Sequence, residues 1–173
     1  MIGSAATLVI ERLLKEFPGA IDAELAHFLK APILLDSYYF EPTLKESKWT
    51  DKDMAVFKQL DELSAGLEDS KVQFERLFNA ITDVGMNLKL GFANLLIKDF
   101  KTYYLLNQGQ TGIGMGTIHV PLRVMIDIFG MDSMIHDMSE LIAKRKLAFY
   151  GILTNCRDTA TGEYKKEVLL YHP

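Results

Sequence analysis

The pattern of apolar residues changes near Asp99, and this change limits the folds that the chain can adopt. Before it, apolar residues recur at helical spacing, as they do over residues 70–83. After it, Phe100 to Leu106 and Ile113 to Val120 are expected to be strands, separated by the turn residues Asn107-Gln108-Gly109. Helices followed by strands and a further helix predict an α/β fold with a mixed β-sheet flanked by helices.

Polar residues typical of helix N-caps precede several of the apolar runs. Ser4 and Asp22 stand at such positions, and Thr50 with Asp53 forms the pattern of a capping box. Ser64-Ala65-Gly66 is the candidate linker. The expected helices cover residues 4–17, 22–30, 51–63, 70–83, 88–97 and 132–146, and the last strands cover 147–154 and 167–171, joined by a loop at 158–162.

The composition is that of an ordinary globular chain. It has 173 residues, 49% of them hydrophobic, and its 19 basic and 23 acidic residues give a net charge of −4. Without an excess of basic residues, no nucleic-acid partner is expected. The longest stretch without charged side chains, Thr102 to Leu122, contains four glycines and is too polar for a membrane span. Cys156 is the only cysteine, which excludes an intrachain disulfide and favours a cytoplasmic location.

Asp36 is the first candidate for a metal ligand. It follows Ile33-Leu34-Leu35, a short apolar run expected to be a buried parallel strand. In α/β proteins, ligands gather beyond the carboxyl ends of strands, and a carboxylate there suits Mg²⁺ or Mn²⁺. The structural alternative is that Asp36 caps the turn that follows the strand.

Lys98 and Lys101 flank the entry to the first strand after the pattern change. Lys101 could neutralise a phosphate group as a point charge, although an exposed lysine in contact with water remains the alternative. Lys144-Arg145-Lys146 closes a helix, where cations are favoured by the helix dipole. His119, on the second strand, could face a cleft.

Glycines alternate along this second strand, at Gly112, Gly114 and Gly116. They do not form a phosphate-binding loop, because no Gly-Lys-Ser or Gly-Lys-Thr sequence follows them. Bare glycine on one face of a strand indicates close packing against a neighbouring element.

Four segments together resemble the DHH phosphoesterase superfamily, in the branch of family II inorganic pyrophosphatases, exopolyphosphatases and Prune proteins. Gly3-Ser4-Ala5-Ala6-Thr7 is similar to the helix start that follows the family's Asp-His-His motif, and Ile33 to Tyr38 resembles the family strand that ends in a metal-binding Asp. Trp49 to Asp53 is similar to the start of the helix leading to the next domain. Leu95 to Lys101, followed by Gly112 to Met115, resembles the DHH-associated type-2 domain.

The resemblance implies a function and roles for individual residues. Asp36 would be a ligand of Mn²⁺ or Mg²⁺, and Lys101, with Lys98 beside it, would bind pyrophosphate or polyphosphate. Residues 1–45 would be the remnant of the catalytic domain, with helices and one strand. Residues 46–66 would be a linker and connecting helix, and residues 67–173 the truncated DHH-associated type-2 domain.

The sequence also departs from the family pattern. The Asp-His-His motif is missing, and so is the basic Ser-Arg-Lys segment that follows the last strand in the family. The chain is therefore expected to be an excerpt of a longer hydrolase, cut at both ends and inactive alone. A non-catalytic interaction or regulatory module with this fold is the second hypothesis, and an unrelated α/β domain is the third.

Overall fold

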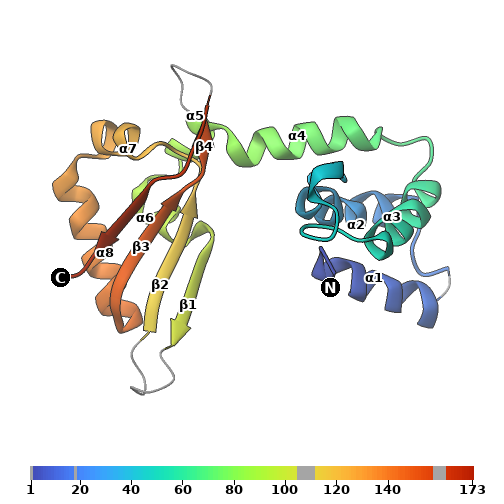
Figure 1. Cartoon of the computed structure of the whole chain (residues 1–173), viewed down its shortest axis with the longest axis horizontal. Helices are drawn as coiled ribbons and strands as arrows, with labels where there is room; N and C mark the ends of the chain where they lie inside the picture. Colours follow the sequence, from blue (N-terminus) through green and yellow to red (C-terminus); the bar gives the residue numbers. More distant parts are fainter. Residues whose placement is uncertain (1, 18, 105–111, 158–162) are drawn as a thin grey trace. The chain divides into compact units, whose positions relative to one another are not determined.

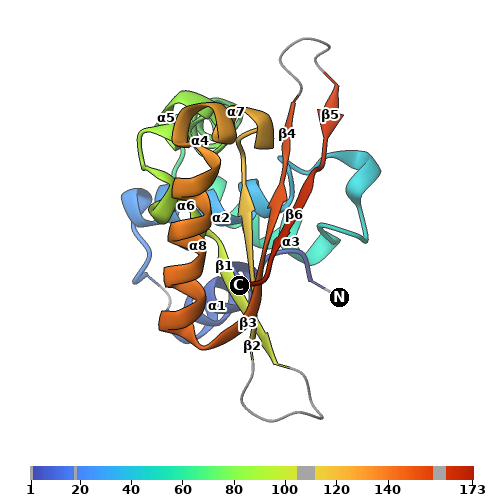
Figure 2. The same ribbon diagram turned by 90° about the vertical axis from the view of Figure 1, so that its left-hand side faces the viewer.

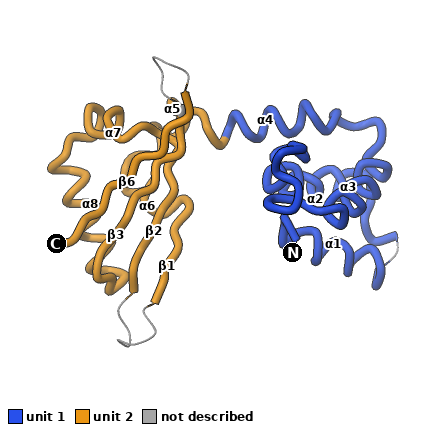
Figure 3. Tube along the Cα trace, viewed as in Figure 1, with its two compact units in different colours: residues 1–80 blue, residues 81–173 orange. Residues whose placement is uncertain are grey.

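The chain folds into two compact units, residues 1–80 and residues 81–173 (Figure 3). The computed structural model describes residues 2–17, 19–104, 112–157 and 163–173. The predicted turn at 107–109 and the predicted loop at 158–162 lie outside these residues. Among the described helices, none is long and apolar enough to cross a membrane.

The first unit is helical. It contains α1 (Ala5–Glu16), α2 (Ala23–Asp36), a short 3₁₀ helix (Pro42–Leu44), α3 (Asp51–Leu63) and most of α4 (Ser70–Thr82), as Figure 1 shows. Its core is formed by apolar residues of α1, α2, α3 and the segment between the last two, which include Ile10, Ala26, Ile33, Leu34, Trp49, Val56 and Leu60. The helices predicted over residues 51–63 and 70–83 are confirmed.

The predicted strand at Ile33-Leu34-Leu35 is wrong, because these residues continue α2. Pro32 lies inside this helix and cannot donate a hydrogen bond to the preceding turn, which costs about 3 kcal/mol or more. Packing compensates for this loss, since Ala26, Ile33 and Leu34 are buried in the core against α3. Asp36 therefore ends a helix instead of a strand, and the described part of residues 1–45 contains no strand.

The Asp53 carboxylate joins the starts of α1 and α3. It is fully buried and accepts five hydrogen bonds: from the backbone N–H of Gly3 and Ser4, from the Thr7 hydroxyl, and from the N–H and hydroxyl of Thr50, at 2.7–3.1 Å. Burial raises the pKa of Asp53, but these donors outweigh burial and lower the pKa to about 2, from 3.8. The charged carboxylate is thus part of the folded state.

The second unit is a mixed sheet with helices on one face. α5 (Val84–Leu88) and α6 (Phe92–Lys98) precede β1 (Phe100–Tyr104) and β2 (Gly112–Ile118), and α7 (Leu122–Phe129) and α8 (Met131–Arg145) precede β3 (Leu147–Thr154). β6 (Val168–Tyr171) completes the strand order β1-β2-β3-β6, in which only β2 and β3 are parallel. Figure 2 shows α6, α7 and α8 on the same side of this sheet.

The mixed α/β sheet confirms the predicted fold class, with local differences. The helix predicted over 88–97 corresponds to α6, which begins only at Phe92, after Gly91 with φ 76°, and the short α5 before it was not predicted. α7 was not predicted, and neither was the hairpin of β4 (Cys156–Arg157) and β5 (Tyr164–Lys165). The two units are defined by contacts within the chain and meet at residues 80 and 81. They do not test the domain segments 1–45, 46–66 and 67–173 that the family resemblance implies, which stay a prediction.

The glycines of β2 pack closely, as predicted. Gly112, Gly114 and Gly116 are buried on the sheet face that α6 and α8 cover. A Cβ atom at Gly116 would overlap the hydroxyl of Tyr150, which itself donates a 2.5 Å hydrogen bond to the Leu96 carbonyl. Glycine at position 116 therefore lets the buried Tyr150 link β3 to α6.

Protonation of Asp53 is expected to destabilise the first unit. A carboxyl with a lowered pKa stabilises the fold above its unfolded pKa, near 3.8, and this contribution is lost as the pH falls toward 2. The loss is about 2 kcal/mol in the free energy of unfolding, measured by urea titration between pH 5 and pH 2. Asp53→Asn should abolish most of this pH dependence. Asp51→Asn, at an exposed position of the same helix, should retain it, and equal curves for the two variants would contradict the assignment.

The substitution Gly116→Ala is expected to destabilise the second unit by about 2 kcal/mol, because the new methyl group must displace Tyr150 or Leu96. Thermal unfolding monitored by circular dichroism measures the change. Gly85→Ala is the matched control, since a Cβ atom there meets nothing closer than 3.4 Å. If Gly116→Ala unfolds at the same temperature as the control, β2 tolerates a side chain and the packing argument is wrong.

Candidate phosphate-binding site

Three charged residues, Lys98, Asp99 and Lys101, lie at the junction of α6 and β1. α6 ends at Lys98, Asp99 is its C-cap, and β1 begins at Phe100. The Phe100 ring stacks on Tyr150, with 6.0 Å between centroids and 2° between ring planes. Because side chains alternate along a strand, Lys101 then points to the opposite face of the sheet from Phe100.

Lys101 lines a cavity of about 350 Å³ on the sheet face that the unit's own helices leave uncovered. The strand register explains this arrangement, since Lys101 pairs with Met115 and Thr117 pairs with Leu153. The lining combines one cation, one carboxylate, the hydroxyl groups of a tyrosine and a threonine, and apolar side chains. Its residues are Asp99, Lys101, Tyr103, Met115, Gly116, Thr117 and Leu153.

The charges in this cavity form a loose ion pair. Lys101 Nζ lies 3.3 Å from Asp99 Oδ1, and the two side chains are 61% and 46% exposed. An ion pair this open to solvent contributes about 1 kcal/mol or less to stability. The bond between Lys101 and Asp99 can therefore be exchanged for another partner of the Lys101 ammonium at small cost.

Lys98 points elsewhere. Its ammonium donates a 2.5 Å hydrogen bond to Asn87 Oδ1 and a longer one, 3.4 Å, to the Ile81 carbonyl. Burial lowers the pKa of Lys98, partly offset by the nearby Asp99 charge. Lys98 thus fastens α6 to the start of the second unit, and the structure brings Lys101 without Lys98 to the cavity.

Asp36 lies at the end of α2 in the first unit and is exposed. The turn after it is unusual, because Tyr38, Tyr39 and Phe40 all have positive φ, 51°, 53° and 57°. Each such residue costs about 1–2 kcal/mol. Ring contacts help to offset this cost, since Tyr38 packs on Phe78, Tyr39 on Phe74 and Phe40 on Trp49.

A divalent metal site requires several ligands around the ion. In the described part of the chain, no group of three or more His, Cys, Asp or Glu side chains is arranged to hold a metal ion. Asp36 is a single carboxylate, so the described residues do not make a complete Mn²⁺ or Mg²⁺ site.

His119 lies at the carboxyl end of β2 and does not line the cavity. Its Nδ1 is 2.8 Å from the carbonyl oxygen of Asn155, which can only accept, so Nδ1 carries the proton. Cys156, next to Asn155, is buried.

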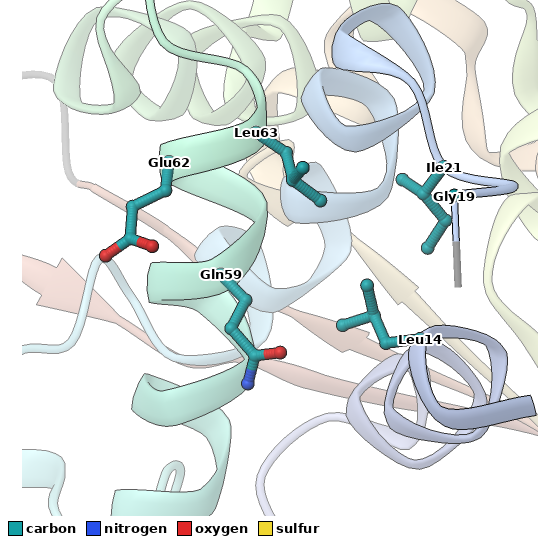
Figure 4. A pocket seen from close by; sticks show the side chains of 6 residues that line it. All are labelled: Leu14, Gly19, Ile21, Gln59, Glu62 and Leu63. Carbon is teal, nitrogen blue, oxygen red and sulfur yellow. The ribbon is translucent and has the colours of Figure 1, made fainter. Parts of the chain in front are cut away.

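Another cavity, of about 430 Å³, lies within the first unit between α1, α3 and the segment after α1. Figure 4 shows Leu14, Ile21 and Leu63 directed toward one another, with the Glu62 carboxylate directed away from them. Among the residues that the structure describes, its lining contains no lysine or arginine and consists of Leu14, Gly19, Ile21, Gln59, Glu62 and Leu63. An anion is better matched by the cavity at Lys101.

The sequence indicated Lys101 but not the residues around it. Tyr103 follows Lys101 by two positions on β1, and strand alternation alone could have placed it on the same face. Met115, Thr117 and Leu153 come from β2 and β3, and their proximity depends on the register between strands. That register is set by packing across the sheet and could not be read from one segment.

Comparison with known proteins identifies relatives. No protein-family model matches the sequence. The chain is 33% identical over 143 residues to "Exopolyphosphatase PRUNE1" of Mus musculus, covering 80% of this chain and 30% of the relative. It is 32% identical over 126 residues to the protein of the same name from Homo sapiens, covering 73% and 26%. The chain thus spans less than a third of the length of these curated relatives.

Among solved structures, the fold is similar to that of a Methanococcus jannaschii "putative family II inorganic pyrophosphatase". The TM-score is 0.63 at 20% sequence identity, and the match covers 97% of this chain and 53% of that one. At this identity the likeness establishes the fold.

Proposed function

The chain belongs to the DHH phosphoesterase superfamily, and on that premise we propose that it is the substrate-binding part of a metal-dependent phosphoanhydride hydrolase. The substrate is pyrophosphate or polyphosphate. The observation that carries the proposal is the cavity of about 350 Å³ on the open face of the sheet, whose lining includes Lys101 and Thr117. The parent protein would act in the cytoplasm, and the predicted limits 1–45, 46–66 and 67–173 would be its domain segments.

Lys101 can bind a phosphate oxygen by a charge-assisted hydrogen bond, and Thr117 can donate a second one. Met115 and Leu153 add apolar side chains to the same lining, while the Lys101 ammonium stays accessible to water and to a ligand. The bond of Lys101 to Asp99 is weak enough to be exchanged for the phosphate. These residues bind and orient a phosphate chain, and none of them is placed to attack it.

The metal chemistry of the reaction would depend on residues beyond those described. Asp36 would contribute one carboxylate to Mn²⁺ or Mg²⁺, as the family resemblance implies. Two-metal hydrolysis holds its ions about 3.5–4 Å apart, and a single carboxylate does not hold two ions in that way. We therefore propose that this chain binds the substrate but does not turn it over alone.

Lys101→Ala is expected to weaken tripolyphosphate binding by about five- to tenfold, the effect of losing one partly exposed charge-assisted contact. Isothermal titration calorimetry on the 173-residue chain measures it. Lys101→Arg should retain most of the affinity. The control is Lys144→Ala, which removes the same charge from the exposed end of α8. Equal affinities for the Lys101→Ala and Lys144→Ala variants would refute the assignment of Lys101.

With either Mn²⁺ or Mg²⁺ present, the purified chain is expected to release no more phosphate from pyrophosphate or tripolyphosphate than a control reaction that contains the metal ion but no protein. A colorimetric phosphate assay measures this. Turnover at the rate of an ordinary enzyme, about 1 s⁻¹ or more, would show that the described residues suffice for catalysis. It would contradict the division of roles proposed here.

A further inference from the structure

Asp99 and Lys101 enter the same cavity with opposite charges. Lys101 Nζ lies 3.3 Å from Asp99 Oδ1, and both residues line the cavity of about 350 Å³. The rest of the lining is uncharged, since it consists of Tyr103, Met115, Gly116, Thr117 and Leu153. The Lys98 ammonium is engaged by Asn87 Oδ1. Asp99 and Lys101 together therefore set the charge that a ligand meets here.

A free polyphosphate anion is poorly matched to this pair. A phosphate oxygen at Lys101 stands close to Asp99 as well, so the repulsion from one charge nearly cancels the attraction to the other. Both side chains are partly exposed, so water weakens the attraction and the repulsion alike and the two stay comparable in size.

A phosphate chain that carries Mg²⁺ is well matched. Mg²⁺ prefers oxygen ligands, keeps several of its water molecules, and is commonly held by one or two carboxylates together with substrate phosphates. With the ion on the phosphate chain, Asp99 changes from a source of repulsion to a source of attraction, while Lys101 still donates to a phosphate oxygen.

We propose that Asp99 selects the Mg²⁺ complex of the phosphate chain over the free anion. Lys101 binds a phosphate oxygen, and Asp99 interacts with the ion that the substrate brings, directly or through the water molecules of that ion. This inference rests on the proposed function, because it assigns the charge state of the ligand that binds at Lys101. It makes Asp99 a specificity-determining residue.

The test is calorimetric titration of tripolyphosphate into the 173-residue chain, with and without Mg²⁺ at equal ionic strength. In the wild-type chain, Mg²⁺ should strengthen binding by about fivefold, the effect expected of one partly exposed charge interaction. In Asp99→Asn, binding without Mg²⁺ should be tighter than in the wild type, and the strengthening by Mg²⁺ should disappear.

The matched control is Asp127→Asn, which removes an exposed carboxylate of α7 that pairs with Arg123 and does not line the cavity. It should keep the wild-type response to Mg²⁺, because the net charge changes equally in both variants. Asp99→Ser is a second variant, for use if Asp99→Asn disturbs the end of α6 as judged by circular dichroism.

The possible outcomes separate this inference from the proposed function. If Mg²⁺ changes the affinity of wild type, Asp99→Asn and Asp99→Ser by the same factor, Asp99 does not select the complex and the inference is wrong. In that case weaker tripolyphosphate binding by Lys101→Ala would still support the proposed phosphate-binding function. If Lys101→Ala binds tripolyphosphate as tightly as the wild type, or the wild type does not bind it at millimolar concentration, the proposed function fails and the inference fails with it.

Discussion

The first unit depends on one buried carboxylate. Asp53 accepts hydrogen bonds from two segments, around Gly3–Thr7 and at Thr50, which lie more than 40 residues apart. Gly3 must be glycine here, since a Cβ atom would overlap the Lys48 carbonyl. A buried charge without partners would be unfavourable by several kcal/mol, whereas five donors make this one favourable. The directions in which α1 and α3 start are therefore fixed by the same group.

This interaction also explains part of the family resemblance. The two short motifs at residues 3–7 and 49–53 are far apart in the sequence, but their polar groups meet at Asp53. Helix capping and burial account for both motifs without any role in chemistry. Likeness in these segments is therefore evidence of a shared fold, and the phosphate-binding proposal depends instead on Lys101 and the residues around it.

Sequence patterns within one segment correctly predicted those elements that depend on residues close together in the chain. The capping box at Thr50 and the apolar spacing that follows it predicted α3, and the alternating glycines predicted the tight packing of β2. The strand assigned to Ile33–Leu35 failed because Pro32 reads as a helix end, while burial of α2 residues against α3 outweighs the cost of proline. The cavity lining was not predictable, because it is assembled by pairing between β1, β2 and β3.

Burial decides which charged residues of this protein can serve a ligand. Asp53 is fully buried and accepts five hydrogen bonds, and Lys30 is 1% exposed and bound to Asp61 at 3.0 Å. Replacing either partner would leave an uncompensated charge, so these groups are committed to the fold. Asp99 and Lys101 are of the same residue types but about half exposed, and water already competes for them. A phosphate chain need only replace that water, which makes this pair better suited to reversible binding than the buried Asp53 and Lys30.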